Sequence, residues 1–210
     1  VFTITVTDDG TGTLSDTMTV TITVNGANDA PSAGSDQTGG VTEDASTTTA
    51  TGTVSGSDDD ASASLTYTPD STSGTYGSFA MSGASWTYTL DNSDADTTAL
   101  DAGDAPTETF TITVSDGTAS DTMTVTITVT GANDAPSAGS DQTASLTEDA
   151  STSTASDTVG SSDADASASL TYTPSNSGSG TYGSIAFSGA TWTYTLDNSD
   201  SDTDALAAGA

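Results

Sequence analysis

The 210-residue sequence lacks every side chain that carries a positive charge, with no Lys, Arg or His against 30 Asp and Glu residues. Without basic residues the chain cannot neutralise phosphates, so nucleic acids and anionic membrane surfaces are poor partners. Because Cys is absent as well, the usual general bases, soft metal ligands and activated nucleophiles are missing. Carboxylates, hydroxyls and amides remain, and these are ligands for hard cations, chiefly calcium.

Apolar residues are also scarce, at 32% of the chain. The missing cysteines exclude a disulfide scaffold and leave the redox compartment open. No apolar run reaches the length of a membrane helix, so membrane insertion is not expected. The sequence starts inside a strand-like pattern without a signal-like segment, and we expect it to be part of something longer. Only a thin core can form, and repulsion between carboxylates opposes it unless cations screen or bind them.

The sequence repeats itself at a domain-sized interval. The hexapeptide GANDAP occurs at 26–31 and again at 131–136, and SWTYTLDNSD at 85–94 returns as TWTYTLDNSD at 191–200. These copies predict three segments. They are a C-terminal hairpin of a preceding repeat with its linker (1–31), a complete repeat (32–136), and a second repeat lacking its last strand pair (137–210).

Nearly every segment alternates with period two, which is typical of half-buried β-strands. Three sets of residues each share one strand face: Phe110, Ile112 and Val114; Met123, Val125, Ile127 and Val129; Trp86, Tyr88 and Leu90. Asp116-Gly117 between two such runs predicts a tight hairpin. Helical periodicity is nearly absent, with at most a turn near 97–103. The pattern predicts an all-β fold of immunoglobulin-like sandwich domains.

The segments GTYGSFAMSGASWTYTLDN (74–92) and FTITVSDGTASDTMTVTITVTGANDAP (110–136), with their repeated counterparts, carry a family resemblance. The repeat resembles the VCBS and cadherin-like repeats found in tandem in giant, RTX-type bacterial surface adhesins. The resemblance covers essentially the whole chain. It implies tandem cadherin-like β-sandwiches in an extended rod or fibre, with calcium ions between successive domains.

The resemblance also implies a set of metal ligands. In cadherin-type repeats these are a Glu at the end of the first strand, an Asn-Asp in the linker, and an Asp-x-Asp plus a later Asp of the following domain. At the junction after the complete repeat the matching residues are Glu43, Asn133, Asp134, Asp163 and Asp165. At the preceding junction they are Asn28, Asp29, Asp58, Asp60 and Asp116, and Glu148 would serve the junction that follows.

The cadherin Asp-Arg-Glu motif is missing because the chain has no Arg. Asp91 lies in that neighbourhood without a firm assignment, which leaves the number of ions per junction open. The alternative interpretation is that these acids are turn formers and solubilising charges, as most of the 30 must be. For the two junction clusters the metal interpretation is favoured, since converging carboxylates and an amide supply the oxygens that calcium prefers.

The two ends of the sequence fall in nearly the same loop of the repeat. Residues 1–24 have the sequence of the hairpin that would follow residue 210. One interpretation is that the sequence is a window of a longer, quasi-periodic chain. The other is that each molecule donates its N-terminal hairpin to a neighbour by strand addition and builds a filament. The first interpretation is the simpler one.

The favoured function is a structural spacer, a calcium-stiffened stalk of a secreted bacterial surface adhesin or an extracellular fibre. Its partners would be neighbouring identical repeats or subunits at the cell surface. The alternatives are a filament subunit that polymerises by donor-strand exchange and, less favoured, a carbohydrate- or cell-binding module. Enzymatic activity is not expected, because the acids lie in loops that repeat identically without a substrate groove.

Overall fold

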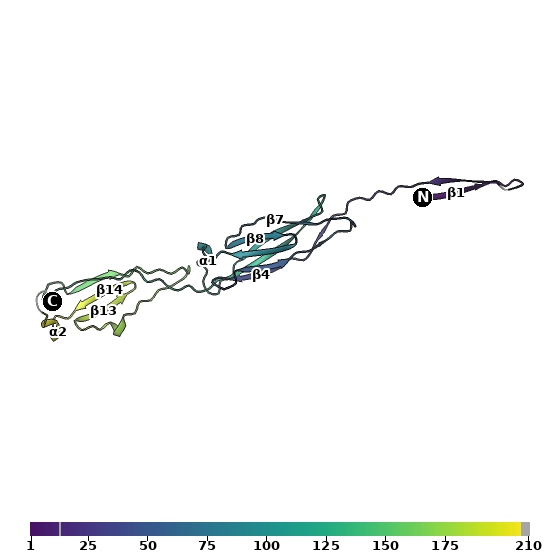
Figure 1. Cartoon of the computed structure of the whole chain (residues 1–210). Coiled ribbons are helices and arrows are strands. Elements are labelled where there is room, and N and C mark those ends of the chain that lie inside the picture. The colour runs from purple at the N-terminus through teal and green to yellow at the C-terminus, as the bar shows by residue number, and fades with distance from the viewer. Residues whose placement is uncertain (13, 207–210) are drawn as a thin grey trace.

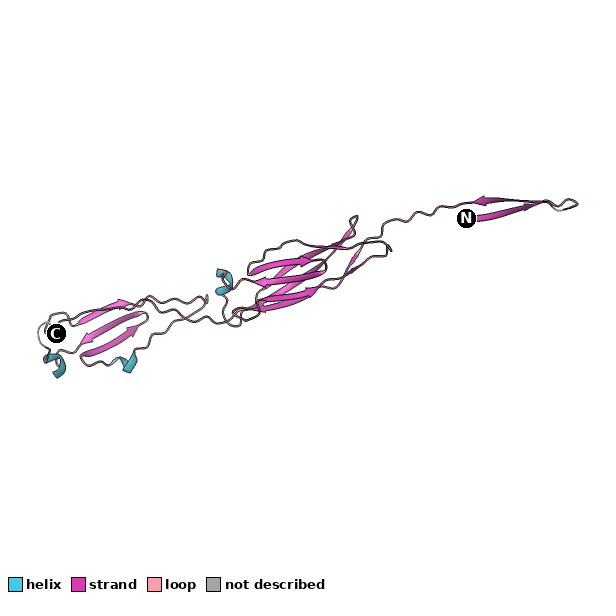
Figure 2. Ribbon diagram, viewed as in Figure 1, coloured by secondary structure: helices cyan, strands magenta, loops and turns pink. Residues whose placement is uncertain are grey.

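The computed structural model describes residues 1–12 and 14–206, and its strands fall into three groups that follow one another in chain order (Figure 1). Residue 13 of the predicted segment 1–31 and residues 207–210 of the predicted segment 137–210 lie outside the described residues. Strands dominate, and the described helices are single short turns (Figure 2). The all-β prediction is confirmed, while the predicted domain boundaries stay predictions.

The central unit, residues 32–131, is a sandwich of two sheets. One sheet has the order β4-β11-β10-β7 and the other β5-β9-β8, with β3 and β6 pairing separately. β4 runs parallel to β11, and the other pairs are antiparallel. The elements are β3 (Ser32–Ala33), β4 (Gln37–Thr42), β5 (Thr49–Thr53), β6 (Gly56–Ser57), β7 (Thr66–Pro69), β8 (Gly77–Ser82), β9 (Ser85–Leu90), α1 (Ala95–Thr98), β10 (Thr107–Ser115) and β11 (Ser120–Thr130).

The core of the central unit lies between these two sheets. Phe79 of β8 stacks on Phe110 of β10 with ring centroids 4.4 Å apart, which joins the sheets at their centre. All three predicted strand faces are buried: Phe110, Ile112 and Val114; Met123, Val125, Ile127 and Val129; Trp86, Tyr88 and Leu90. Period-two alternation therefore identified both inner faces of the sandwich.

Tight turns connect the antiparallel strands. Asp116-Gly117 lies between β10 and β11 as predicted, and Gly117 adopts a φ of 94°. A two-residue turn joins β8 to β9, with Ser82 paired to Ser85 and Gly83 at a φ of 59°. Positive φ at the first turn residue is the hairpin geometry that glycine tolerates best.

The C-terminal unit, residues 137–206, has one sheet, of order β12-β14-β13. It contains β12 (Thr154–Thr158), η1 (Ser175–Gly178), β13 (Gly183–Ser188), β14 (Thr191–Leu196) and α2 (Ser201–Asp204). This sheet is the counterpart of β5-β9-β8. The counterparts of β4 and β7, at 142–147 and 171–174, are not strands. In the central unit β4 and β7 pair with the β10–β11 hairpin.

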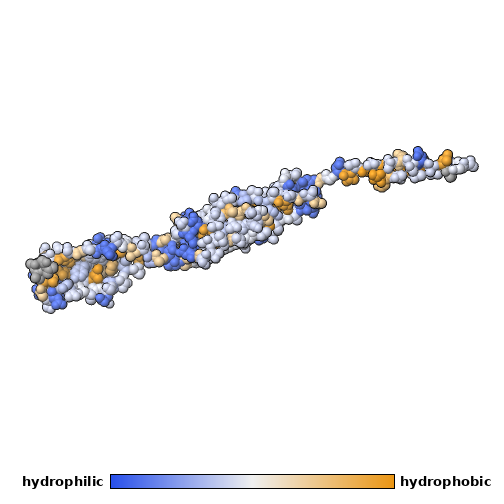
Figure 3. Space-filling view, in the orientation of Figure 1, coloured by the Kyte–Doolittle hydropathy of each residue, from blue (hydrophilic) through white to orange (hydrophobic). Residues whose placement is uncertain are grey.

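An N-terminal hairpin, β1 (Phe2–Thr7) and β2 (Ser15–Val20), precedes the central unit. Its register is that of β10–β11: Phe2 pairs with Val20 and Ile4 with Met18, as Phe110 pairs with Val125 and Ile112 with Met123. Its apolar side chains are exposed. They show as orange patches in Figure 3, at the end of the molecule that Figure 1 draws in purple.

Candidate metal centre

Glu43 follows β4 directly and is buried, with 2% of its surface exposed. The main-chain N–H of Ala132 donates to its Oε2 at 3.0 Å. Its Oε1 is buried and has no hydrogen-bond partner among the described residues. A buried carboxylate oxygen without a donor is costly, and the chain offers no Lys, Arg or His to pair with it.

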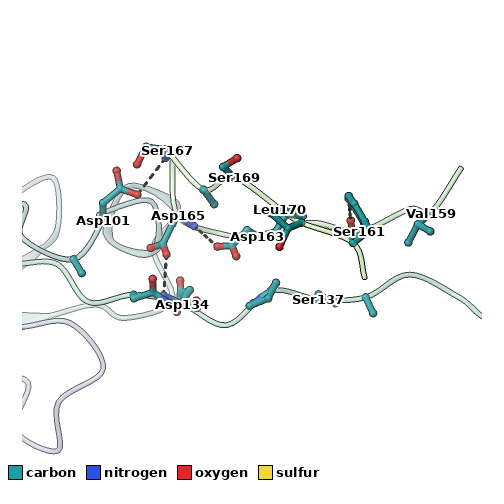
Figure 4. A pocket seen from close by; sticks show the side chains of 17 residues that line it. Asp101, Asp134, Ser137, Val159, Ser161, Asp163, Asp165, Ser167, Ser169 and Leu170 are labelled. Carbon is teal, nitrogen blue, oxygen red and sulfur yellow. Dashed lines mark hydrogen bonds between the residues drawn. The ribbon is translucent and has the colours of Figure 1, made fainter. Parts of the chain in front are cut away.

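Carboxylates from the linker and the C-terminal unit meet beside Glu43. The Asp134 N–H donates to Asp165 Oδ2 at 3.0 Å, and the Asp165 N–H donates to Asp163 Oδ1 at 3.1 Å. Figure 4 shows Asp134 facing Asp163 and Asp165 across the junction. Asp165 Oδ1 is a second buried oxygen without a partner among the described residues. The two units thus share one acidic cluster.

The carboxylates of this cluster repel one another. Burial raises the pKa of Glu43, and the charges of Asp134, Asp44 and Asp165 raise it further, against the lowering effect of the Ala132 N–H. Burial also raises the pKa of Asp134, and the negative charges of Asp44 and Asp165 raise it further. A cation placed among these groups would remove the repulsion that raises both pKa values.

A cleft of about 670 Å³ opens at the same junction, lined by Asp101, Asn133, Asp134, Asp163 and Asp165 among others. Asp101 Oδ1 accepts from the Ser167 N–H at 3.2 Å, and the Ala99 carbonyl accepts from the Ala166 N–H at 3.2 Å. These bonds connect the α1 region of the central unit to the C-terminal unit.

Sequence reasoning missed Asp44 and Asp101. Asp44 stands next to Glu43 in the repeated segment TEDA, which was a usable signal, and its φ of 55° is a turn conformation. Asp101 follows the buried Leu100, and its counterpart in the second repeat is Ala207, so the repeat gave no signal for it. Asp91 instead closes a turn, accepting from the N–H of Ser93 at 2.9 Å and from its hydroxyl at 2.6 Å.

The preceding junction repeats the arrangement. The Asp29 N–H donates to Asp60 Oδ2 at 3.0 Å, and the Asp60 N–H donates to Asp58 Oδ1 at 2.8 Å. Asn28 Nδ2 donates to Asp116 Oδ2 at 3.0 Å. The N–H groups of Ala119 and Thr118 lower the pKa of Asp116, with a smaller contribution from Asn28. Hydrogen bonds therefore connect all five predicted residues of this junction, since Asn28 Nδ2 also donates to the Asp29 carbonyl.

Glu148, the counterpart of Glu43, has a buried Oε2 without a hydrogen-bond partner in the part of the chain that the structure describes. Within residues 1–12 and 14–206, no hydrogen bond joins it to another predicted ligand. Among the described residues, seven buried side-chain polar atoms have no partner, and four of these are carboxylate oxygens. All four belong to predicted ligands: Glu43 Oε1, Asp58 Oδ2, Glu148 Oε2 and Asp165 Oδ1. Buried oxygens lacking donors are the ligands that calcium takes, so the donor set fits the ion in chemistry.

The carboxylates are gathered less tightly than ligands of a bound ion. In the part of the chain that the structure describes, no three Asp or Glu side chains converge closely enough to hold a metal. Both clusters combine a shared location with buried oxygens that have no partner among the described residues, and coordination would require their side chains to move together.

Residues 28–131 match the family model of the bacterial cadherin-like domain. The fold is cadherin-like. Extracellular cadherin domains 1–4 of protocadherin gamma B7 align over 95% of this chain and 49% of theirs, at 19% identity and a TM-score of 0.53. Domains EC1–3 of mouse clustered PcdhgC3 align over 61% of this chain and 42% of theirs, at 25% identity and a TM-score of 0.41.

This chain thus spans less than half the length of either of these cadherin structures. No protein with a curated description matches it. Cadherin-like domains are extracellular adhesion or structural modules rather than enzymes, and they generally bind calcium. Among the described residues, no helix is both long and apolar enough to cross a membrane.

Proposed function

We propose that the chain is a calcium-stiffened spacer of a secreted bacterial surface adhesin or extracellular fibre. The observation that carries the proposal is the cluster of Glu43, Asp134 and Asp165. These residues come from the end of β4, the linker and the next unit, and two of them have buried oxygens without donors. A hinge made only of acids in a chain without basic residues needs an external cation.

The ligands proposed for the central junction are Glu43, Asn133, Asp134, Asp163 and Asp165, joined by Asp44 and Asp101. Calcium would supply the positive charge that these oxygens lack. Glu43 and Asp101 belong to the central unit, whereas Asp163 and Asp165 belong to the next. A shared ion would therefore restrict the linker and extend the pair of units into a rod.

A spacer role also agrees with the distribution of aromatic residues. In the central unit Trp86, Tyr88 and Phe79 are buried in the core, which leaves no aromatic platform for stacking a sugar. The uniform negative charge keeps such a chain soluble and discourages non-specific contacts. Within the central unit that the structure describes, no exposed aromatic side chain therefore favours the carbohydrate-binding alternative.

The test compares calcium with chelator on matched variants. Glu43→Gln keeps an acceptor for the Ala132 N–H but removes a charge from the cluster, and Asp96→Asn changes an exposed acid on α1. Millimolar calcium should stabilise the wild type by about 3 kcal/mol if it exceeds Kd a hundredfold. The Asp96→Asn variant should respond alike, and Glu43→Gln should lose most of the effect.

Small-angle scattering gives the second measurement, because a stiffened hinge fixes the distance between units. The distribution of distances within the molecule should be narrower in calcium and broader in chelator. Identical scattering profiles in the two conditions, together with unchanged melting, would exclude the stiffening role.

A further inference from the structure

Loop 99–104 follows α1 and packs against the linker. The Asp104 N–H donates to the Asp101 carbonyl at 2.9 Å, and the Asp101 N–H donates to Asp104 Oδ2 at 3.2 Å. The Gly131 N–H of the linker then donates to the Asp104 carbonyl at 3.0 Å. A Cβ at Gly131 would meet the Asp101 carbonyl oxygen and lie 2.8 Å from Leu100 Cβ, so loop and linker are in close contact. The loop is therefore fixed to the start of the linker.

The same loop contacts the next unit through two main-chain N–H groups. The Ala166 N–H donates to the Ala99 carbonyl at 3.2 Å. The Ser167 N–H donates to Asp101 Oδ1 at 3.2 Å, a bond that Figure 4 draws. Each bond has its acceptor in the central unit and its donor in the next, and neither bond includes a cation. Loop 99–104 therefore joins the two units directly.

The acids of this loop differ between the repeats. The central unit reads Leu-Asp-Ala-Gly-Asp at 100–104, whereas the second repeat reads Leu-Ala-Ala-Gly-Ala at 206–210. The segments TYTLDNSD just before them, at 87–94 and 193–200, are identical. A general need of the repeat fold therefore does not account for the two acids of the central unit.

The charges at this junction oppose the contact. Asp101 lines the same cleft as Asp134, Asp163 and Asp165, and without a cation these carboxylates repel one another. At about 150 mM salt, repulsion between exposed charges is screened beyond about 8 Å. Each hydrogen bond favours the closed arrangement roughly two- to tenfold. We therefore expect the two bonds to outweigh the repulsion at this ionic strength.

We propose that loop 99–104 is a clasp that holds the next unit in one orientation when no ion is bound. Calcium then binds to a junction that is already aligned, so less conformational entropy is lost on binding than at a free hinge. The proposal goes beyond the spacer role. Because the clasp acts without an ion, its test runs in chelator and its outcome does not depend on calcium binding.

Double electron–electron resonance measures the distribution of distances between two spin labels, one on each unit. The chain has no Cys, so Thr51→Cys in β5 and Thr193→Cys in β14 supply the attachment sites, and both positions are exposed. The measurement runs in chelator at about 150 mM NaCl, where distant charges are screened. The labelled chain should give a narrow distribution under these conditions.

Two substitutions of Asp101 separate the clasp from simple repulsion. Both remove one negative charge, but Asp101→Asn keeps an oxygen for the Ser167 N–H, whereas Asp101→Ala does not. The second repeat itself carries Ala at this position. Asp101→Asn should leave the distribution narrow, and Asp101→Ala should lower the ratio of clasped to open junctions roughly two- to tenfold and broaden it.

The opposite response of Asp101→Ala would overturn the proposal. Loss of repulsion alone would narrow the distribution in both variants equally, because both lose the same charge. A wild-type distribution in chelator as broad as that of Asp101→Ala would count against the clasp in the same way. A narrow wild-type distribution that calcium does not change would support the clasp and count only against the calcium proposal.

Amide exchange followed by NMR tests the two bonds separately. Residues 60–65 and 165–170 have the same sequence, DASASL, so their N–H groups share the same intrinsic exchange rates. The N–H groups of Ala166 and Ser167 should exchange more slowly than their counterparts in the first copy, which have no acceptor among the described residues. Asp101→Ala should remove the difference at Ser167. Equal exchange of the two copies in the wild type would exclude the clasp.

Discussion

A buried carboxylate organises the core of the central unit. Glu108 of β10 is 9% exposed, and the Tyr88 hydroxyl donates to its Oε2 at 2.5 Å. The N–H groups of Thr75 and Tyr76 donate to Oε1. Burial, with the hydrogen bond to Glu108 and its charge, raises the pKa of Tyr88 well above its usual value. Hydroxyl and amide donors thus satisfy an acid where the chain has no base.

Replacement of Tyr88 tests this network. Tyr88→Phe leaves Glu108 Oε2 without its donor, which should lower the free energy of unfolding by about 1–3 kcal/mol. The control is Tyr194→Phe, since the half-buried Tyr194 hydroxyl has no hydrogen-bond partner among the residues described. Denaturant unfolding followed by tryptophan fluorescence measures both. Equal losses in the two variants would show that the Glu108 contact contributes nothing of its own.

Residues of this kind limit prediction from sequence. Alternation assigns Glu108 to the same face as Phe110 and Ile112, but its two main-chain N–H donors lie in a loop more than thirty residues earlier. The family resemblance predicted Glu43, Asp134 and Asp165 as ligands, and the structure brings these carboxylates together. Asp101 lies in the same cleft because of how the chain folds, and no local sequence pattern predicts this position.

At the scale of elements, strand formation depends on a partner as well as on sequence. The tetrapeptide Thr-Tyr-Thr-Pro is strand β7 at 66–69, where it pairs with β10. The identical tetrapeptide at 171–174 is not a strand. Alternation thus predicted the two core sheets of the central unit, and it could not predict which strands remain unformed in the C-terminal unit.

The turn between β8 and β9 is an element that the sequence does determine. Gly83 has a φ of 59°, and an added Cβ would meet no heavy atom within 4 Å. Gly83→Ala should therefore cost about 1 kcal/mol, from the backbone conformation alone. Gly26→Ala, equally open but without a positive φ, should leave thermal unfolding unchanged. A neutral Gly83→Ala would mean that the turn readily adopts another conformation.

For the whole molecule, the formal charge of −30 opposes compaction. In chelator, raising NaCl from 0.01 to 0.1 M shortens the screening length from about 30 to about 10 Å. The melting temperature should rise, and by the same amount in Glu43→Gln, because screening acts on all the acids. Calorimetry at fixed pH measures this rise. A flat salt dependence would show that distant carboxylates do not limit stability.

The parallel pairing of β4 with β11 has a mechanical consequence. Six residue pairs, from Gln37 with Val125 to Thr42 with Thr130, connect the strand near the start of the central unit to its last strand. Tension applied through the two ends of this unit pulls these strands past each other lengthwise. All six pairs then resist rupture together rather than opening one after another. A chain of such units under tension would be held, in each unit, by the shear resistance of this one six-pair ladder.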